Sequence, residues 1–164
     1  MSIRAVASAV GVTPPSIYIH FADKDALIRA ACEETFHLFD AFVEERVAHI
    51  ADPTQQLAER GRAYIDFGVR HPEHYRVLFM GKARAQHDDA VTEASGFAHL
   101  LDNVQRCIDA GSIAVEDPMV VATGLWTLVH GITSLAVSVP GYPVVGLDEL
   151  VDHMLDVYAR GLAG

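Results

Sequence analysis

Residues 2–27 have the sequence SIRAVASAVGVTPPSIYIHFADKDAL, and this stretch decides the fold of the N-terminal part of the chain. Ile3, Val6 and Ala7 give its first residues one apolar side at helical spacing. Gly11 follows at the point where this helix must end, because glycine adopts left-handed backbone angles without a Cβ clash. The stretch is therefore predicted to begin as a short helix followed by a turn.

A second short helix is predicted directly after this turn. Thr13 is a residue type favoured at the N-cap, and Pro14 stands at the first helical position, where its missing N–H costs nothing. Asp23 is predicted to cap a third helix, with Lys24 beside it. Two short helices joined by a tight turn form a helix-turn-helix, whose second helix can enter the major groove of DNA.

The same stretch resembles the DNA-binding region of tetracycline-repressor-like (TetR) regulators. The resemblance is carried by three segments, AVASAVGVT at 5–13, SIYIHF at 16–21 and ADKDAL at 22–27. Its most specific part is a Tyr-x-His-Phe-x-x-Lys run made of Tyr18, His20, Phe21 and Lys24. The resemblance implies an all-α transcriptional regulator with an N-terminal helix-turn-helix head.

The family resemblance also predicts how the chain is divided. Members of this family have a further helix before the motif, whereas this sequence begins at Met1 without it. The head, residues 1–30, is therefore expected to be an incomplete three-helix unit that lacks its leading helix. Residues 31–164 are expected to form a helical domain that binds an effector and dimerises.

The resemblance implies which side chains contact double-stranded DNA. Those expected at base edges are Thr13, Pro14 and Ser16, and those expected at phosphates are Arg4, Tyr18, His20 and Lys24. Hydroxyl, imidazole and ammonium groups suit phosphate oxygens, and such contacts position a protein without reading the base sequence. The alternative is that the aromatic residues only pack the small head, which is the preferred interpretation for Phe21.

The charge distribution favours DNA contact at the head, residues 1–30, over contact at the rest of the chain. The 164 residues carry a net charge of −10, which is unusual for a DNA-binding protein. Residues 1–30, however, hold three basic and two acidic side chains, so the negative charge belongs to the remainder. A hydrophobic content of 51% indicates a globular protein. Cys32 and Cys107 lie on predicted apolar faces, which favours reduced thiols and a cytoplasmic location.

Beyond the head, the apolar spacing predicts only helices. The longest runs from Asp23 to Ile50, roughly 40 Å at 1.5 Å per residue, and links the head to the body. Its predicted apolar stripe consists of Ile28, Cys32, Phe36, Phe39, Val43, Val47 and Ile50. Further helices are predicted over 52–71, 73–80, 88–110 and 148–162, with one more from residue 118, and a loop over 81–87.

Residues 118–147 contain no Asp, Glu, Lys or Arg, which raises the possibility of a membrane span. Acidic flanks and several Thr, Ser and Gly residues speak against it. The preferred interpretation is a helix buried in the core and in a subunit contact. The chain is therefore expected to form a homodimer through its last two helices, with no membrane association.

Trp126-x-x-x-His130-Gly131 resembles a pattern in one subgroup of the family's C-terminal domains. Trp126 and His130 share one helix face because they are four residues apart. One interpretation makes His130 a hydrogen-bonded core residue. The other makes it the polar group of a pocket for a small, partly apolar effector, whose apolar walls are Tyr64, Phe67, Phe79 and Trp126.

No catalytic, cofactor or metal site is expected. Glu34 and His37 have the spacing of half a di-iron site, but a second Glu-x-x-His is missing from the sequence. His71 and His74 lack a third ligand at convincing spacing. The resemblance to TetR regulators implies a ligand-responsive repressor that binds a palindromic operator as a dimer. Two alternatives stay open: a ligand-binding and dimerisation module without DNA affinity, and a small metal-dependent enzyme.

Overall fold

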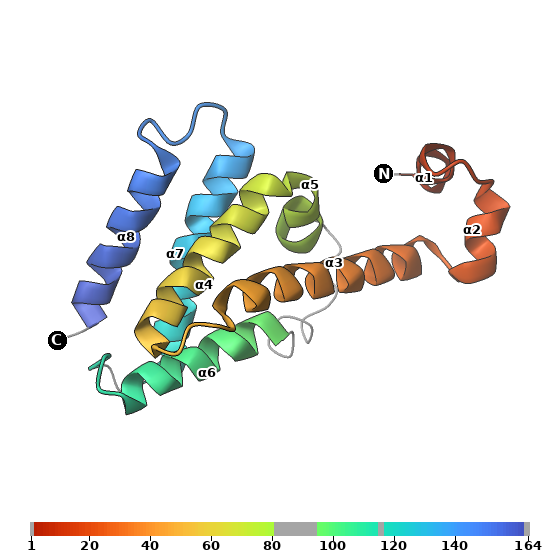
Figure 1. Ribbon diagram of the computed structural model, residues 1–164. Helices are drawn as coiled ribbons and strands as arrows, with labels where there is room; N and C mark the ends of the chain where they lie inside the picture. Colours follow the sequence, from red (N-terminus) through yellow and green to blue (C-terminus); the bar gives the residue numbers. More distant parts are fainter. Residues whose placement is uncertain (1, 81–94, 115–116, 163–164) are drawn as a thin grey trace.

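A computed structural model of the chain describes residues 2–80, 95–114 and 117–162 (Figure 1). Its elements are α1 (Ile3–Ala9), α2 (Pro14–His20), α3 (Lys24–Val47), α4 (Pro53–Arg70), α5 (Pro72–Tyr75), the π-helical segment η1 (Arg76–Met80), α6 (Ser95–Asp109), α7 (Pro118–Ser138) and α8 (Leu147–Leu162). Within these ranges there is no strand, and the all-α prediction is confirmed. The predicted loop at 81–87 and the start of the helix predicted from residue 88 lie outside the described residues.

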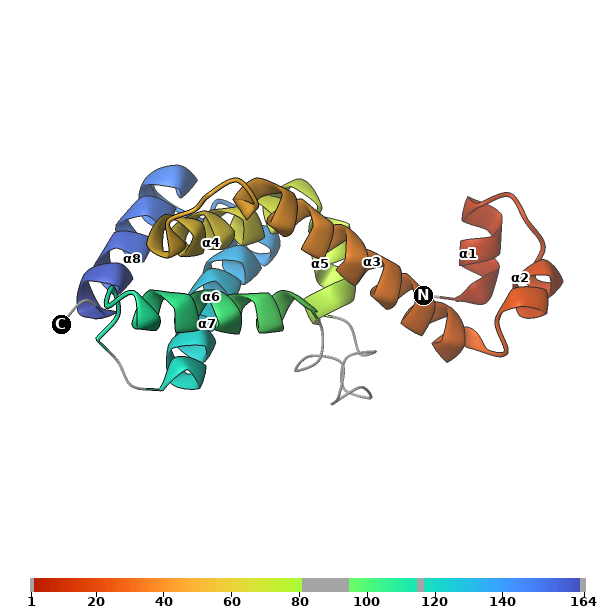
Figure 2. The same ribbon diagram turned by 60° about the horizontal axis from the view of Figure 1, so that its bottom comes forward.

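Helices α1 and α2 form a small head at one end of α3, apart from the body (Figures 1 and 2). They pack on each other through Ala7 and Ile17, the two buried side chains of the head. Gly11 makes the turn between them with a φ of 71°. Thr13 occupies the N-cap position of α2 as predicted, although its hydroxyl lies 2.8 Å from Oγ of Ser16 and makes no capping hydrogen bond.

Helix α3 carries the chain from the head into the body. The Asp23 side chain caps it by accepting a hydrogen bond from the Ala26 N–H at 2.7 Å. The helix crosses the predicted domain boundary at residue 30 without a break. It ends at Val47 instead of the predicted Ile50, because the buried Gln56 side chain donates to the carbonyl oxygens of both residues, at 3.1 and 3.3 Å.

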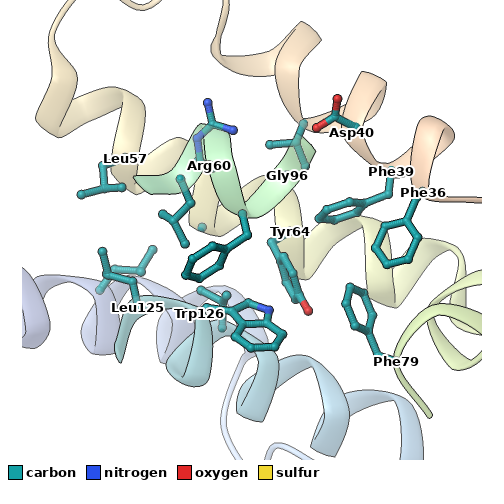
Figure 3. Close-up of a pocket in the computed structure, with 16 residues that line it drawn as sticks. Phe36, Phe39, Asp40, Leu57, Arg60, Tyr64, Phe79, Gly96, Leu125 and Trp126 are labelled. Atoms are coloured by element: carbon teal, nitrogen blue, oxygen red, sulfur yellow. The ribbon is translucent and has the colours of Figure 1, made fainter. Parts of the chain in front are cut away.

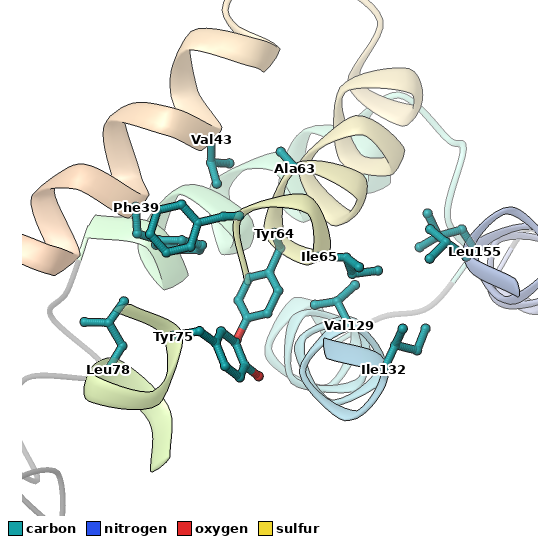
Figure 4. Packing of buried hydrophobic residues seen from close by; sticks show 12 residues of the cluster. Phe39, Val43, Ala63, Tyr64, Ile65, Tyr75, Leu78, Val129, Ile132 and Leu155 are labelled. Atoms are coloured by element: carbon teal, nitrogen blue, oxygen red, sulfur yellow. The ribbon is translucent and has the colours of Figure 1, made fainter. Parts of the chain in front are cut away.

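Helix α4 is the centre of the body and packs against α3, α6 and α7. Asp52 caps it as predicted, accepting from the Gln55 N–H at 2.8 Å. Figure 4 shows its Tyr64 and Ile65 between side chains of α3 and α7. The approach of α7 is close at Gly68, where a Cβ atom would lie 2.2 Å from Cγ2 of Thr133.

Helix α7 contains the uncharged run and has two different faces. One face is buried against α4 and α6 and includes Val121, Leu125, Val129 and Ile132. By length and composition alone this helix could cross a membrane, but the buried helix of a globular core meets the same criteria. Its contacts with α4 and α6 make α7 a core helix of the body.

Candidate functional site

The head presents one face of α2 to solvent. Tyr18 is 52% exposed and Ile19 is 80% exposed, whereas Ile17 is buried against α1. Pro14 is half-buried at the start of the helix, and the neighbouring Pro15 is exposed. The part of α2 that is free to meet a partner is therefore the side opposite Ile17.

The other residues expected to contact DNA are also on the surface of the head. Arg4 on α1, His20 at the end of α2 and Lys24 at the start of α3 are exposed. Thr13 is exposed and Ser16 is half-buried, and their hydroxyl groups are hydrogen-bonded to each other. The side chains predicted to bind phosphates are thus accessible on α1, α2 and the start of α3.

The body holds a cavity of about 80 Å³ between α3, α4, η1, α6, α7 and α8 (Figure 3). Its walls are mainly apolar and include the aromatic residues Phe36, Phe39, Tyr64, Phe79, Phe97 and Trp126. The Phe36 and Phe79 rings meet edge to face at 6.0 Å, as do those of Phe97 and Trp126. A compact apolar ligand suits such a space, since one water molecule occupies roughly 10–15 Å³ of it.

Three of the five residues predicted for the pocket line this cavity, namely Tyr64, Phe79 and Trp126. Phe67 is buried beside it, with its ring centroid 5.1 Å from that of Phe39, and does not line it. Phe67 follows Tyr64 by three residues on α4, but its ring packs against Phe39 and Phe42 of α3.

His130 also lies outside the cavity lining, behind the aromatic wall. Its Nδ1 is 3.0 Å from the Tyr64 hydroxyl and 2.9 Å from the Tyr75 hydroxyl. Its ring centroid is 5.6 Å from that of Trp126. The imidazole therefore holds side chains of α4, α5 and α7 in place, an arrangement close to the hydrogen-bonded core histidine that the sequence offered as one interpretation.

The cavity has a polar end that the sequence analysis did not identify. Arg60 on α4 lines the cavity although it is only 7% exposed, and its guanidinium forms an ion pair with Glu44 on α3. Asp40 lines the same end, and its Oδ1 lies 3.3 Å from Nδ1 of His99 on α6. The sequence contained one indication that Arg60 lies near the cavity. Arg60 precedes Tyr64 by four residues, so the two side chains share one face of the helix.

Asp40, Glu44 and His99 are also the described side chains that could share a metal ion, since their ligand atoms all lie within 4.8 Å of one another. His99 Nδ1 is 3.1 Å from Oε1 of Glu44. Glu44, however, already accepts hydrogen bonds from Arg60. An ion at this place would have to compete with that guanidinium.

Both cysteines are free thiols in a protected setting. Cys107 is fully buried in the cluster between α6 and α7, and Cys32 is half-buried with Sγ 3.9 Å from the Val77 carbonyl oxygen. Burial raises the pKa of the Cys107 thiol and that of the Cys32 thiol. The thiolate, which is the nucleophilic form, is therefore disfavoured at both positions.

Comparison with known proteins agrees with this geometry. Residues 57–158 match the family described as "Tetracyclin repressor-like, C-terminal domain", and residues 1–31 match "Bacterial regulatory proteins, tetR family".

Several solved structures share the fold. A protein of unknown function from Rhodococcus sp. RHA1 has a TM-score of 0.85 and 27% identity, over 100% of this chain and 86% of that one. AibR in complex with isovaleryl coenzyme A and operator DNA has a TM-score of 0.75 and 22% identity, over 96% and 86% of the two chains. A TetR family transcription regulator from Marinobacter aquaeolei VT8 has a TM-score of 0.74 and 16% identity, over 99% and 84%.

Proposed function

The chain belongs to the TetR family of transcriptional regulators, and we propose that it is a ligand-responsive repressor that binds a palindromic operator as a homodimer. Residues 1–30 contact DNA, and residues 31–164 bind the effector and dimerise. The observation that carries the proposal is the course of α3. Its first residue, Lys24, belongs to the exposed head, and its Phe36, Phe39 and Asp40 line the cavity.

The DNA contact is proposed from the exposed face of the head. Tyr18, His20 and Lys24 hold phosphates, Arg4 reaches the backbone from α1, and Thr13, Pro14 and Ser16 face base edges. The exposure of Arg4, Thr13, Tyr18, His20 and Lys24 supports this assignment, because these side chains can reach a duplex without unfolding of the head. Asp23 and Asp25 flank Lys24 and keep the local charge small. The affinity is therefore expected to rest on a few phosphate contacts made by each head.

The homodimer is proposed from the outer face of α7. Along it, an uncharged stripe of exposed or half-buried residues recurs at steps of three and four: Val120, Thr123, Thr127, Gly131, Leu135 and Ser138. A solvent-facing helix normally carries charges on its outer side. Val157 on the neighbouring α8 is exposed as well. A second copy that packs its own α7 and α8 here would cover both helices in a two-fold contact.

The effector is proposed to be a small, partly apolar molecule in the aromatic cavity. AibR, the relative crystallised with isovaleryl coenzyme A, shows that a protein of this fold can hold a ligand with a short branched acyl group. An effector releases DNA only if it binds the DNA-free conformer more tightly than the DNA-bound one, and a tenfold preference corresponds to about 1.4 kcal/mol. Helix α3 connects the effector cavity with the DNA-binding head, since it is a single helix that runs from the head to the cavity.

Fluorescence anisotropy with DNA from the region upstream of the chain's own gene tests this function. Nanomolar to micromolar binding that weakens steeply with salt, by a species of dimeric mass in light scattering, is the expected result. A dimer with no affinity above that for random DNA would instead favour the ligand-binding module without DNA affinity. Membership of the TetR family speaks against the enzyme alternative, because its members are generally non-enzymatic.

A further inference from the structure

Arg60 is a buried cation with one unsatisfied donor. The ends of its guanidinium group donate to Glu44, with Nη1 bonded to Oε1 and Nη2 lying 3.4 Å from Oε2. The remaining donor, Nε, is buried and has no hydrogen-bond partner among the described residues. Buried donors are nearly always paired in native structures, so this N–H calls for an acceptor.

The cavity is a place from which an acceptor can reach Arg60. Arg60 lines it together with mainly apolar side chains, and Figure 3 shows Arg60 and Asp40 at the same end. The Asp40 carboxylate lies against the His99 ring through Oδ1. A molecule that fills the cavity is therefore an available source of an oxygen for Nε.

The charges at this end of the cavity determine whether a carboxylate or an uncharged carbonyl group of a ligand is the better acceptor for Nε of Arg60. Arg60 already pairs with the carboxylate of Glu44, and Asp40 adds a second carboxylate to this end of the cavity. A carboxylate ligand would bring a third negative group into a partly buried place and be repelled. An uncharged carbonyl oxygen accepts the hydrogen bond without that penalty.

We propose that the effector carries an uncharged carbonyl group on a compact apolar body, and that this oxygen accepts a hydrogen bond from Nε of Arg60. The inference rests on the proposed effector cavity. It adds the chemical class of the ligand and the residue that selects it. In this arrangement the aromatic walls bind the apolar body, and Arg60 fixes its orientation.

Three probes with the same branched chain and similar shape test the proposal: methyl isobutyl ketone, diisopropylmethane and isovalerate. Trp126 is the single tryptophan of the chain and lines the cavity, so its fluorescence reports binding of each probe. The ketone offers a neutral acceptor, the hydrocarbon offers none, and isovalerate offers a charged one. The wild-type protein is expected to bind the ketone more tightly than isovalerate at neutral pH.

The decisive comparison uses the double variant Arg60→Met/Glu44→Gln, which removes the donor without leaving an unpaired charge. Its affinity for the ketone should fall about tenfold or more, while its affinity for diisopropylmethane changes less than twofold. The control is Arg62→Met/Asp152→Asn, which removes an exposed ion pair between the same helix α4 and α8 and should change neither affinity. Arg60→Lys keeps the charge but has no Nε–H, and should give the same selective loss if the double variant fails to fold.

Three results would overturn the inference: equal changes for ketone and hydrocarbon, tighter binding of isovalerate than of the ketone, or no saturable ketone binding at millimolar concentrations. Operator binding, measured separately on the same protein, keeps this inference distinct from the proposed function. A protein that binds its operator but shows no Arg60 dependence remains a regulator, with a different ligand class.

Discussion

The Tyr75 hydroxyl lies 2.9 Å from Nδ1 of His130 and donates to the carbonyl oxygen of the same residue at 3.2 Å. The Tyr64 hydroxyl is 3.0 Å from the same Nδ1. One consistent arrangement has Tyr75 donating to the carbonyl and Tyr64 donating to an unprotonated Nδ1, with the ring proton on Nε2. These bonds join α4, α5 and α7 directly behind the cavity wall.

Replacing Tyr75 by Phe should therefore destabilise the body. The residue is fully buried, and the substitution removes the hydroxyl that donates to the His130 carbonyl oxygen and leaves that acceptor without this donor. The expected loss is about 1–3 kcal/mol in the free energy of unfolding from urea denaturation. Tyr18→Phe, at an exposed position of the head, should change it by less than about 0.5 kcal/mol. Equal effects of the two substitutions would mean that the Tyr75 hydroxyl is not structurally important.

The contact between α4 and α7 depends on the absence of a side chain at Gly68. In Gly68→Ala the new Cβ would meet the buried Thr133 methyl group, so the two helices would have to separate. A loss of about 1–3 kcal/mol in unfolding free energy is expected. Gly161→Ala is the matched control, because a Cβ there has no neighbour within 4 Å and alanine favours helix. A Gly68→Ala protein with an unchanged unfolding free energy would show that α4 and α7 have room for a methyl group at this position.

The buried thiol of Cys107 predicts how stability depends on alkaline pH. Burial raises its pKa in the folded state, so the unfolded chain loses the proton first as the pH rises. The free energy of unfolding should therefore fall once the pH exceeds about 8.5, the ordinary thiol pKa, and keep falling until the folded pKa is passed. Denaturation midpoints from pH 7 to pH 10 measure this slope.

Cys107→Ala should make the alkaline pH dependence of the unfolding free energy shallower. The remaining pH dependence is expected from Cys32 and Tyr158, because burial also raises their pKa values. If the Cys107→Ala protein shows the same slope as the wild-type protein, then other groups cause the loss of stability at alkaline pH.

The proposed dimer face makes a further prediction. Leu135→Glu places a charge in the uncharged stripe on α7, and burying an unpaired charge in a subunit contact is strongly unfavourable. Light scattering should show a shift from dimer to monomer at micromolar concentration. Val145→Glu, at an exposed position between α7 and α8, should leave the dimer intact. A Leu135→Glu protein that stays dimeric would place the subunit contact elsewhere.

Local signals in the sequence were enough to predict most of the helices. Asp23 and Asp52 cap the helices predicted to follow them, and Gly11 turns the chain as expected. The end of α3 was predicted three residues too late because Gln56, which stops it, reaches back from the next helix. That is a tertiary contact with no local pattern.

The cavity was only partly predictable for a related reason. The Trp-x-x-x-His-Gly pattern identified Trp126, and Tyr64 and Phe79 were also predicted correctly, yet the sequence could not show that Phe67 turns toward α3 instead. Its polar end joins Asp40, Arg60 and His99 from three helices. Nothing in the sequence places these residues together until α3, α4 and α6 are packed.

Phosphate contact by Lys24 on an operator is tested most directly by the salt dependence of DNA affinity. Each dimer should lose two phosphate contacts in Lys24→Ala, so the slope of log affinity against log salt should become shallower by about 2. The loss of affinity should be similar for operator and random DNA. Arg70→Ala, at an exposed position on the body, should keep the wild-type slope. A wild-type protein whose DNA affinity does not respond to salt, or a Lys24→Ala protein with an unchanged slope, would contradict DNA binding through this head.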